Sequence, residues 1–214
     1  MILKHQEILL FTGDSVTDCG RARPHSYGLG GLGEGYPRLV YSLLQLDYVD
    51  RDIAVVNTGT SGDTTAHILA RMDEDILAVQ PHVLSIMIGI NDVWRHYDTP
   101  ALGGIHIDVD QYRRNYTEII ERSLAMPQLR CMLLLTPFFL DQSAQDPMRR
   151  QAEAYAGVVR ELACQDARLR LVDIAAAFDK LTARRHYMQL ASDRVHPNPT
   201  AHLFIAREVM AALN

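Results

Sequence analysis

Several residues of this chain are of the types that activate a hydroxyl nucleophile. Ser15 lies in the polar run Thr12–Asp18, and His196 follows Asp193 by three residues near the end of the chain. A serine hydroxyl is a weak nucleophile until a base takes its proton, and histidine suits that task because it titrates near neutral pH. A carboxylate on the far ring nitrogen fixes the tautomer and balances the charge. The pattern predicts a charge system in which Ser15 is the nucleophile, His196 the base and Asp193 the orienting carboxylate.

Each of these features also has a plainer interpretation when it is taken alone. The run Gly13–Ser15 has the composition of a strand-to-helix turn with a capping serine. Gly59 and Gly62 could be turn glycines, and Asn91 could cap a helix. A lone histidine is more often structural than catalytic. The combination of Ser, Gly and Asn at strand ends with an Asp-x-x-His turn favours catalysis over coincidence.

Five short apolar runs predict the strands that position these residues. Four are nearly continuous, which is typical of parallel strands covered on both faces, and Arg170 interrupts the fifth, which indicates an edge strand. The five predicted strands are Ile8–Thr12, Ile53–Asn57, Val83–Ile88, Cys131–Leu135 and Leu169–Asp173.

Helical stretches alternate with these strands and complete a three-layer α/β/α sandwich with a five-stranded parallel sheet, of flavodoxin-like type. In such sheets the ligand crevice lies beyond the carboxyl ends of the strands, where the loops after the first three strands converge. No Pro/Gly-rich linker divides the chain, so residues 1–214 are predicted to form one domain. The predicted helices are Tyr36–Leu46, Thr64–Val79, Asp110–Ala125, Met148–Gln165 and Thr200–Leu213.

Composition excludes several classes of protein. Hydrophobic residues make up 48% of the 214 and charged residues 22%, which fits a folded domain rather than a disordered or fibrous chain. The formal net charge is −5 and no long basic run occurs, so a nucleic-acid partner is not expected. No stretch of about 20 apolar residues is present, so no membrane span is expected.

The three cysteines and the N-terminal segment predict a cytoplasmic protein. Cys19, Cys131 and Cys164 are odd in number and widely spaced, which argues against a disulfide scaffold and favours a reducing compartment. The first ten residues carry charge within their apolar stretch and lack a signal-peptide pattern.

Three other patterns lack the context that their chemistry requires. Gly28–Gly33 spells G-x-G-x-x-G but does not follow a strand directly, as a dinucleotide site would demand. Cys19 has no base close in sequence that would make it a nucleophile. His106 and Asp108 have no third ligand at a recognisable spacing. Neither a metal nor a cofactor is therefore expected.

Taken in order, the motifs resemble the SGNH hydrolases, also called GDSL esterases, whose four blocks supply Ser, Gly, Asn and His. The match covers nearly the whole chain. The chain departs from the family pattern only slightly, because Val16 stands where Leu or Ile is usual. The matching segments are Gly13–Ser15, Gly59, Gly89–Asp92 and Asp193–His196.

The resemblance implies a role for each matched residue. Ser15 would attack the acyl carbon, with His196 as general base and then general acid and Asp193 as its orienting partner. The oxyanion would be held by the backbone N–H groups of Ser15 and Gly59 and by the side-chain amide of Asn91.

Longer stretches narrow the resemblance to intracellular bacterial acetylxylan esterases. These are Gly13–Pro24, Ile86–Arg95 and Gln145–Arg150. Such enzymes remove acetyl groups from the xylose units of short oligosaccharides, and they are oligomeric. The resemblance therefore implies a small acylated carbohydrate as substrate and a homo-oligomer.

Four residues are candidates for binding that substrate: Asp14, Trp94, Arg95 and Tyr97. Trp94 lies three positions after Asn91, so its ring could face the cleft and pack on a pyranose, or it could belong to the core. Arg95 and Tyr97 could bond sugar hydroxyls or be ordinary surface groups. In the close relatives a tryptophan often precedes the Asp of Asp-x-x-His, where this chain has Ser192.

Two other functions are compatible with the fold. A lysophospholipase, thioesterase or general arylesterase could use the same catalytic residues. A substrate with a long acyl chain would require a long apolar channel. A flavodoxin-like binding module without catalysis is also possible, because fold does not dictate function. That module would leave Asp193-x-x-His196 unexplained.

Overall fold

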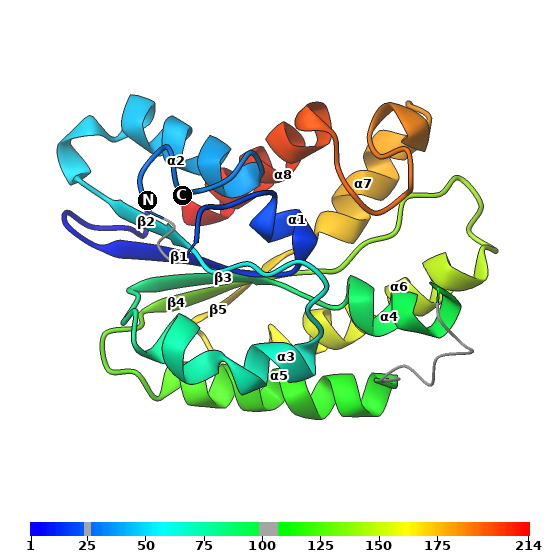
Figure 1. Cartoon of the computed structure of the whole chain (residues 1–214), viewed down its shortest axis with the longest axis horizontal. Helices are drawn as coiled ribbons and strands as arrows, with labels where there is room; N and C mark the ends of the chain where they lie inside the picture. The colour runs from blue at the N-terminus through cyan, green and yellow to red at the C-terminus, as the bar shows by residue number, and fades with distance from the viewer. Residues whose placement is uncertain (24–26, 99–106) are drawn as a thin grey trace.

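A five-stranded parallel sheet forms the centre of the molecule (Figure 1). The structure is a computed structural model that describes residues 1–23, 27–98 and 107–214. All neighbouring strands pair in parallel, in the order β2-β1-β3-β4-β5. The predicted sheet is therefore confirmed, and the strand containing Arg170 does lie at an edge. The strands are β1 (Ile8–Gly13), β2 (Ala54–Asn57), β3 (Val83–Met87), β4 (Cys131–Leu135) and β5 (Leu169–Val172).

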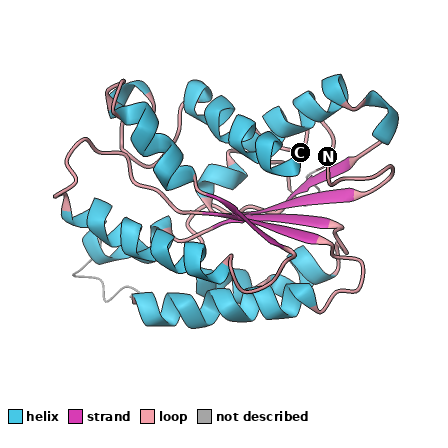
Figure 2. Ribbon diagram, turned by 180° about the vertical axis from the view of Figure 1, so that it is seen from behind, coloured by secondary structure: helices cyan, strands magenta, loops and turns pink. Residues whose placement is uncertain are grey.

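Helices cover both faces of this sheet. One layer contains α2 (Tyr36–Asp47), α7 (Ile174–Thr182), α8 (Pro199–Leu213) and the short α1 (Ser15–Asp18). The other contains α3 (Thr65–Ala70), α4 (Ile90–Asp98), α5 (Val109–Leu124) and α6 (Pro147–Leu162). The same two layers flank the sheet when it is seen from behind (Figure 2). Short helical turns at Val49–Arg51, Asp73–Leu77 and Tyr187–Gln189 complete the described helices.

Two apolar cores lie between these layers because successive strand residues point to opposite faces. Phe11 and Leu133 belong to the core under α2 and α8. Leu10, Leu84 and Leu134 belong to the core above α5 and α6. Both faces of the central strands are therefore buried, which explains why those strands read as continuous apolar runs.

The helices differ from the prediction in two respects. The predicted helices do not include α1, α4 or α7, which are short. The predicted single helix Thr64–Val79 is instead the α-helix α3 followed by a π-helical turn at Asp73–Leu77. Arg71, between the two, directs its guanidinium to the carbonyl groups of Gly13 and Thr58 at the carboxyl edge of the sheet.

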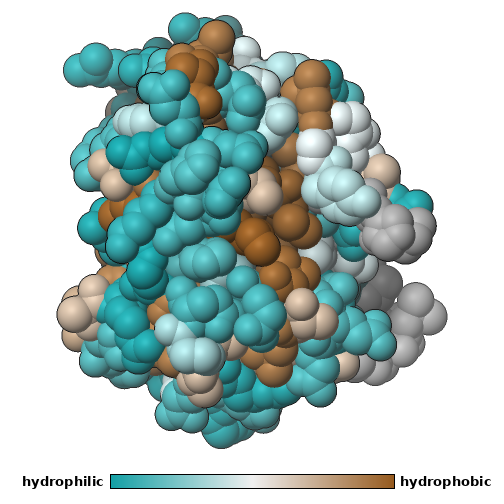
Figure 3. Space-filling model, turned by 90° about the vertical axis from the view of Figure 1, so that its left-hand side faces the viewer, coloured by the Kyte–Doolittle hydropathy of each residue, from teal (hydrophilic) through white to brown (hydrophobic). Residues whose placement is uncertain are grey.

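The two ends of the chain lie side by side. The Ile2 N–H donates to the carbonyl of Leu213 at 2.7 Å, and both ends appear together in Figure 1. The face of the molecule on that side is mainly hydrophilic, with hydrophobic side chains in patches (Figure 3). Within the described residues no helix is long and apolar enough to cross a membrane.

Candidate active site

The turn from β1 into α1 presents Ser15 at the carboxyl edge of the sheet. Gly13 precedes it, and a Cβ added there would lie 2.2 Å from the carbonyl oxygen of Met87 on the neighbouring strand, so only glycine fits. Asp14 caps α1 by accepting a hydrogen bond from the Val16 N–H at 3.0 Å. Ser15 is thus the first residue of α1, where its own N–H is free of the helix ladder.

The structure brings Ser15, His196 and Asp193 together in the predicted order. Ser15 Oγ lies 2.9 Å from His196 Nε2, and His196 Nδ1 lies 2.6 Å from Asp193 Oδ2. When Nδ1 donates to the carboxylate, Nε2 is left as the acceptor for the serine proton. Two residues 181 positions apart in sequence are therefore arranged as a nucleophile and its base.

Asp193 is held in its ionised form. Partial burial would raise its pKa, but hydrogen bonds from the His196 ring and from two backbone N–H groups outweigh burial and lower it. Those N–H groups belong to Val195 and His196, which donate to Oδ1 at 3.0 and 2.8 Å. The side chains of His196 and Asp193 are 46% and 44% exposed, so the relay opens directly to solvent.

Asn91 lies on the opposite, buried side of the site, at the second position of α4. Its side chain is buried, and Nδ2 donates one N–H to the carbonyl of Asp63 at 2.9 Å. The second N–H of that amide remains to bind another acceptor. The neighbouring Asp92 is fully buried, accepts hydrogen bonds from the N–H and Oγ1 of Thr65, and has its pKa raised to about 6 by burial.

The structure contradicts the role predicted for Gly59. Its N–H donates to Asn57 Oδ1 at 2.9 Å within its own loop, and the residue is buried. A Cβ added to Gly59 would lie 2.5 Å from Asp18 N. Gly59 is therefore glycine because it packs against the backbone of α1, and its amide is already bonded.

Gly62, three residues later, is the glycine that sequence reasoning passed over. Its φ is +88°, a conformation that favours glycine, and a Cβ there would meet only Arg95 Nη2, at 3.6 Å. No acceptor among the described residues is bonded to its N–H. It directly precedes Asp63, whose carbonyl receives the Asn91 amide. Both glycines lie in the same loop, so spacing alone could not choose between them.

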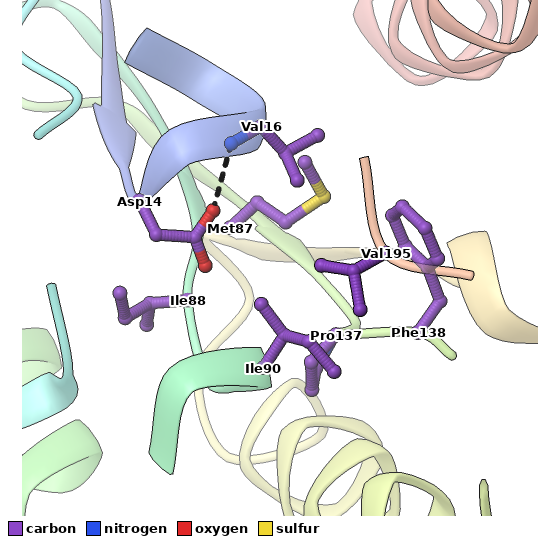
Figure 4. Close-up of a pocket in the computed structure, with 8 residues that line it drawn as sticks. All are labelled: Asp14, Val16, Met87, Ile88, Ile90, Pro137, Phe138 and Val195. Carbon is purple, nitrogen blue, oxygen red and sulfur yellow. Dashed lines mark hydrogen bonds between the residues drawn. The ribbon is translucent and has the colours of Figure 1, made fainter. Parts of the chain in front are cut away.

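Asp14 does not contact solvent as a substrate-binding residue would. Only 2% of it is exposed, and burial raises the pKa of its carboxyl to about 7. It borders a cavity of about 10 Å³, room for about one water, that is otherwise apolar. Figure 4 shows Ile88, Ile90 and Val195 around this space. The prediction that Asp14 binds substrate is therefore wrong, because its carboxyl is sealed beneath α1.

Helix α4 brings two of the other candidates to the edge of the site. The Trp94 ring centroid lies 5.7 Å from that of His196, and part of the indole packs on the core. Arg95 lies near Gly62, as the 3.6 Å approach of its Nη2 indicates. Tyr97 is 43% exposed on the same helix, and Ser192 is exposed beside Asp193.

Arg71 joins the loops that follow β1 and β2. Its Nε donates to Asp63 Oδ2 at 2.6 Å and Nη1 to the Thr58 carbonyl at 2.7 Å. Its Nη2 donates to the Gly13 carbonyl at 3.2 Å. One mostly buried guanidinium thereby fixes the nucleophile turn relative to the loop that contains Gly62.

Asp18, at the end of α1, holds the same loop from the other side. Its Oδ2 accepts from the N–H and the hydroxyl of Ser61 at 3.0 and 2.8 Å, and from Arg23 Nη2 at 2.7 Å. Burial would raise its pKa, but the bonds from Arg23 and Ser61 outweigh burial and lower it. The sequence did not identify Asp18 and Arg71, because their bonds to Ser61 and to the Gly13 carbonyl join positions 43 and 58 residues apart.

Cys19 is paired with a histidine that cannot activate it. His202 Nδ1 accepts a hydrogen bond from the Tyr36 N–H, so Nε2 carries the proton and faces the sulfur at 3.6 Å. Burial raises the pKa of the Cys19 thiol and lowers that of His202 to about 4. Among the described residues no three His, Cys, Asp or Glu side chains form a metal-sized group. His106, which the sequence offered with Asp108 as a metal ligand, lies outside the described residues.

Comparison with known proteins places the chain among acyl ester hydrolases. The GDSL-like Lipase/Acylhydrolase family matches residues 11–203. An acetylxylan esterase from Geobacillus stearothermophilus is 43% identical over 202 residues, which are 94% of this chain and 91% of that enzyme.

Solved structures agree with the sequence relatives. A mutant of Axe2, an acetyl-xylooligosaccharide esterase from the same Geobacillus, superposes with a TM-score of 0.96 at 42% identity, over 100% of this chain and 97% of that one. An alpha/beta hydrolase from the metagenome of Lake Arreo, Spain, gives 0.93 at 34% identity with the same coverage. Catalytic mutants of Axe2 have been solved in which a serine, an aspartate or a histidine is replaced by alanine. This chain belongs to the GDSL-like lipase/acylhydrolase family.

Proposed function

We propose that the protein is a serine esterase that removes acetyl groups from xylo-oligosaccharides through an acyl-enzyme. The observation that carries the proposal is the continuous chain from Ser15 Oγ through the His196 ring to Asp193, at 2.9 and 2.6 Å. The acetylxylan esterases that resemble this chain in sequence and fold supply the substrate class.

Acylation begins when Ser15 Oγ attacks the acetyl carbon and His196 Nε2 takes the hydroxyl proton. The tetrahedral intermediate collapses, its bond to the sugar oxygen breaks, and His196 gives its proton to that oxygen. His196 next takes a proton from water, whose oxygen attacks the acetyl carbon. The bond to Ser15 Oγ then breaks, His196 returns its proton to Oγ, and acetate leaves. Asp193 stays ionised throughout and balances the imidazolium.

Three N–H groups are proposed to hold the oxyanion: the backbone N–H of Ser15, the backbone N–H of Gly62 and the free side-chain N–H of Asn91. Gly62 replaces Gly59 in this role because the Gly59 amide is bonded to Asn57. One such preorganised donor is worth about 3–4 kcal/mol of barrier lowering.

The open side of the site suits an acyl group carried on a sugar. The relay is open to solvent, and Trp94 lies beside His196, so a sugar ring has both access and an aromatic face. Arg95 and Tyr97, on the same helix, are the proposed polar contacts.

A non-catalytic binding module does not account for this arrangement, because binding alone needs no serine, imidazole and carboxylate in sequence. The proposed enzyme is a cytoplasmic homo-oligomer that needs no metal or cofactor. Its location is supported by the three free cysteines, and its assembly by the resemblance to oligomeric acetylxylan esterases.

The test compares specificity constants for acetylated xylo-oligosaccharide, a long-chain ester and an acyl-thioester, in the wild type and in Ser15→Ala. We expect the acetylated sugar to have the highest kcat/KM and Ser15→Ala to lose activity on all three substrates. Preference for either of the other substrates would reject the sugar ester. Near-normal turnover by Ser15→Ala would reject the nucleophile.

A further inference from the structure

The turn that carries Asp193 and His196 is exposed, yet its imidazole lies 2.9 Å from Ser15 Oγ. Nearly half of each side chain faces solvent, so burial of those side chains does not fix their direction. A displacement of about 1 Å at a reacting group can cost on the order of 10²-fold in rate. The turn therefore requires an anchor outside the three catalytic groups.

Arg194, inside this turn, has an unusual backbone conformation. Its φ is +71°, which side-chain-bearing residues rarely adopt. Its N–H donates to the Ala191 carbonyl at 3.2 Å, and its own carbonyl accepts from the Leu140 N–H at 2.9 Å. This conformation disfavours every residue except glycine, Asn and Asp, so surrounding contacts must hold it in place.

The guanidinium of Arg194 makes those contacts. Its Nη1 lies 2.9 Å from Asp141 Oδ2 and 3.4 Å from Asp146 Oδ2. The guanidinium carbon also lies 5.7 Å from the ring centre of Phe139 and 5.5 Å from that of Tyr187. The arginine is thus held by two carboxylates and two aromatic faces.

Three of the four partners of Arg194, namely Phe139, Asp141 and Asp146, lie between β4 and α6. Asp146 also caps α6, because its Oδ1 accepts from the Arg149 N–H at 3.0 Å. Val195, the next residue of the turn, is 1% exposed and packs into the same segment beside Pro137 and Phe138 (Figure 4). Consecutive side chains of the turn therefore dock on the stretch between β4 and α6, one through charge and one through apolar packing.

We propose that Arg194 is a positioning residue, whose ion pairs with Asp141 and Asp146 hold the catalytic turn so that His196 faces Ser15. The proposal rests on the proposed function for its role in catalysis. Arg194 acts through the turn, and its guanidinium binds the segment before α6. Removing the side chain leaves the strained backbone without its anchor, and the direction of the His196 ring becomes variable.

The experiment compares Arg194→Ala, Arg194→Lys and Arg194→Gly by steady-state kinetics on nitrophenyl acetate. We expect kcat to fall about 10- to 100-fold in Arg194→Ala, with KM changing less than about threefold. Arg194→Lys keeps one charge and should recover part of that loss. Arg194→Gly relieves the backbone but lacks the anchor, so it should be more stable than Arg194→Ala and just as slow.

The matched control is Arg168→Ala, which removes a surface ion pair with Asp166 at 2.9 Å at the amino end of β5. Its kcat should equal that of the wild type. A loss of kcat in Arg168→Ala equal to that in Arg194→Ala would overturn the proposal, as would a wild-type kcat in Arg194→Ala. Should Arg194→Ala fail to fold, Asp141→Asn removes the same ion pair from the other side and is expected to slow the enzyme similarly.

A second readout needs no substrate. The proton between His196 Nδ1 and Asp193 should give a far-downfield NMR signal in the wild type and in Arg168→Ala, and that signal should broaden or disappear in Arg194→Ala. An unchanged signal would overturn the proposal. If the wild type hydrolysed nitrophenyl acetate but not acetylated xylo-oligosaccharide, the proposed substrate would be rejected. The NMR signal would still test the role of Arg194.

Discussion

The two halves of the site are built in opposite ways. The relay half, Asp193 and His196, is nearly half exposed, and its proposed anchor is the ion pair of Arg194 with Asp141. The oxyanion half is buried: Asn91 is 4% exposed and Asp92 fully enclosed. Donors that must stabilise a developing charge work best when they cannot reorganise. Arg71 braces this half indirectly, because it bonds Asp63, whose carbonyl receives the Asn91 amide. The relay half must exchange protons with solvent and substrate, and its exposure permits that exchange.

The carboxyl groups follow the same division. Asp193 accepts three hydrogen bonds in a solvated place and has a lowered pKa, so it serves as an anion. Asp14 and Asp92 are buried and have raised pKa values, to about 7 and about 6. One site thus holds carboxyl groups in contrasting environments, and only the exposed one is suited to balance an imidazolium.

The largest effect is expected from His196→Ala in the relay half. It removes the base and should lower kcat on the order of 10⁴-fold or more. Because the side chain is exposed, the midpoint of thermal unfolding should change little. Steady-state kinetics and a melting curve measure both quantities. Wild-type turnover in His196→Ala would show that His196 is not the base.

In the buried half, Asn91→Ala should lower kcat about 10²- to 10³-fold, because it removes one of the proposed oxyanion donors. It also leaves the Asp63 carbonyl without its partner, so some stability should be lost. The control is Asn115→Ala, a buried amide that donates to Thr65 Oγ1 at 3.0 Å. It should lose stability with a much smaller change in kcat; equal losses of kcat would contradict a specific role for Asn91.

The two loop glycines should respond differently to alanine. Gly59→Ala places a Cβ 2.5 Å from Asp18 N, so it should lower the free energy of unfolding by about 1–3 kcal/mol or more. Gly62→Ala meets open space apart from Arg95, at a φ of +88°, and should cost about 1–2 kcal/mol while slowing acetyl transfer. Chemical denaturation and kcat separate the two. A slower enzyme from Gly59→Ala with unchanged stability would restore Gly59 as the donor.

The pH dependence of stability tests the buried carboxyl groups. An unfolded aspartate is ionised above about pH 4, whereas folded Asp14 holds its proton up to about pH 7. In that interval the folded state binds more protons, so the free energy of unfolding should fall as pH rises. Asp14→Asn keeps the acceptor for the Val16 N–H and should flatten this slope between pH 4 and 7. Denaturant titrations across this range would refute the assignment if both proteins gave the same slope.

The smallest effect is expected at the rim of the cleft, from Trp94→Ala. If the indole contributes about 1 kcal/mol to sugar binding, KM for acetylated xylo-oligosaccharide should rise about fivefold. KM for nitrophenyl acetate, which has no sugar, should change less. Equal changes for the two substrates would assign Trp94 to packing.

Sequence patterns predicted the sheet well, because a strand that is buried on both faces appears in the sequence as a continuous run of apolar residues. The runs that became β1, β3 and β4 are continuous apolar segments, and the broken run containing Arg170 lies at an edge. The helices α1, α4 and α7 were missed because each is short. In α4 the polar Asn91 and Asp92, which the site requires, further obscure the helical period.

Within the proposed site, residue type and order predicted Ser15, His196 and Asp193, which the structure places within hydrogen-bond distance of one another. They did not distinguish Gly62 from Gly59, because that distinction depends on which amide is already bonded. Arg194 could not be recognised either, since Asp141 and Asp146 lie about 50 positions away along the chain. Contacts between distant segments leave no periodic pattern in a single sequence.

The central claim is that Ser15 is a nucleophile activated by His196. A fluorophosphonate probe tests this most directly, because Ser15 Oγ would bond to phosphorus, fluoride would leave, and His196 would take the proton. Mass spectrometry of the digested wild type should find one phosphonyl group, on the peptide that contains Ser15, and labelling of His196→Ala should be far slower. Labelling at another residue, or equally fast labelling of His196→Ala, would contradict the account.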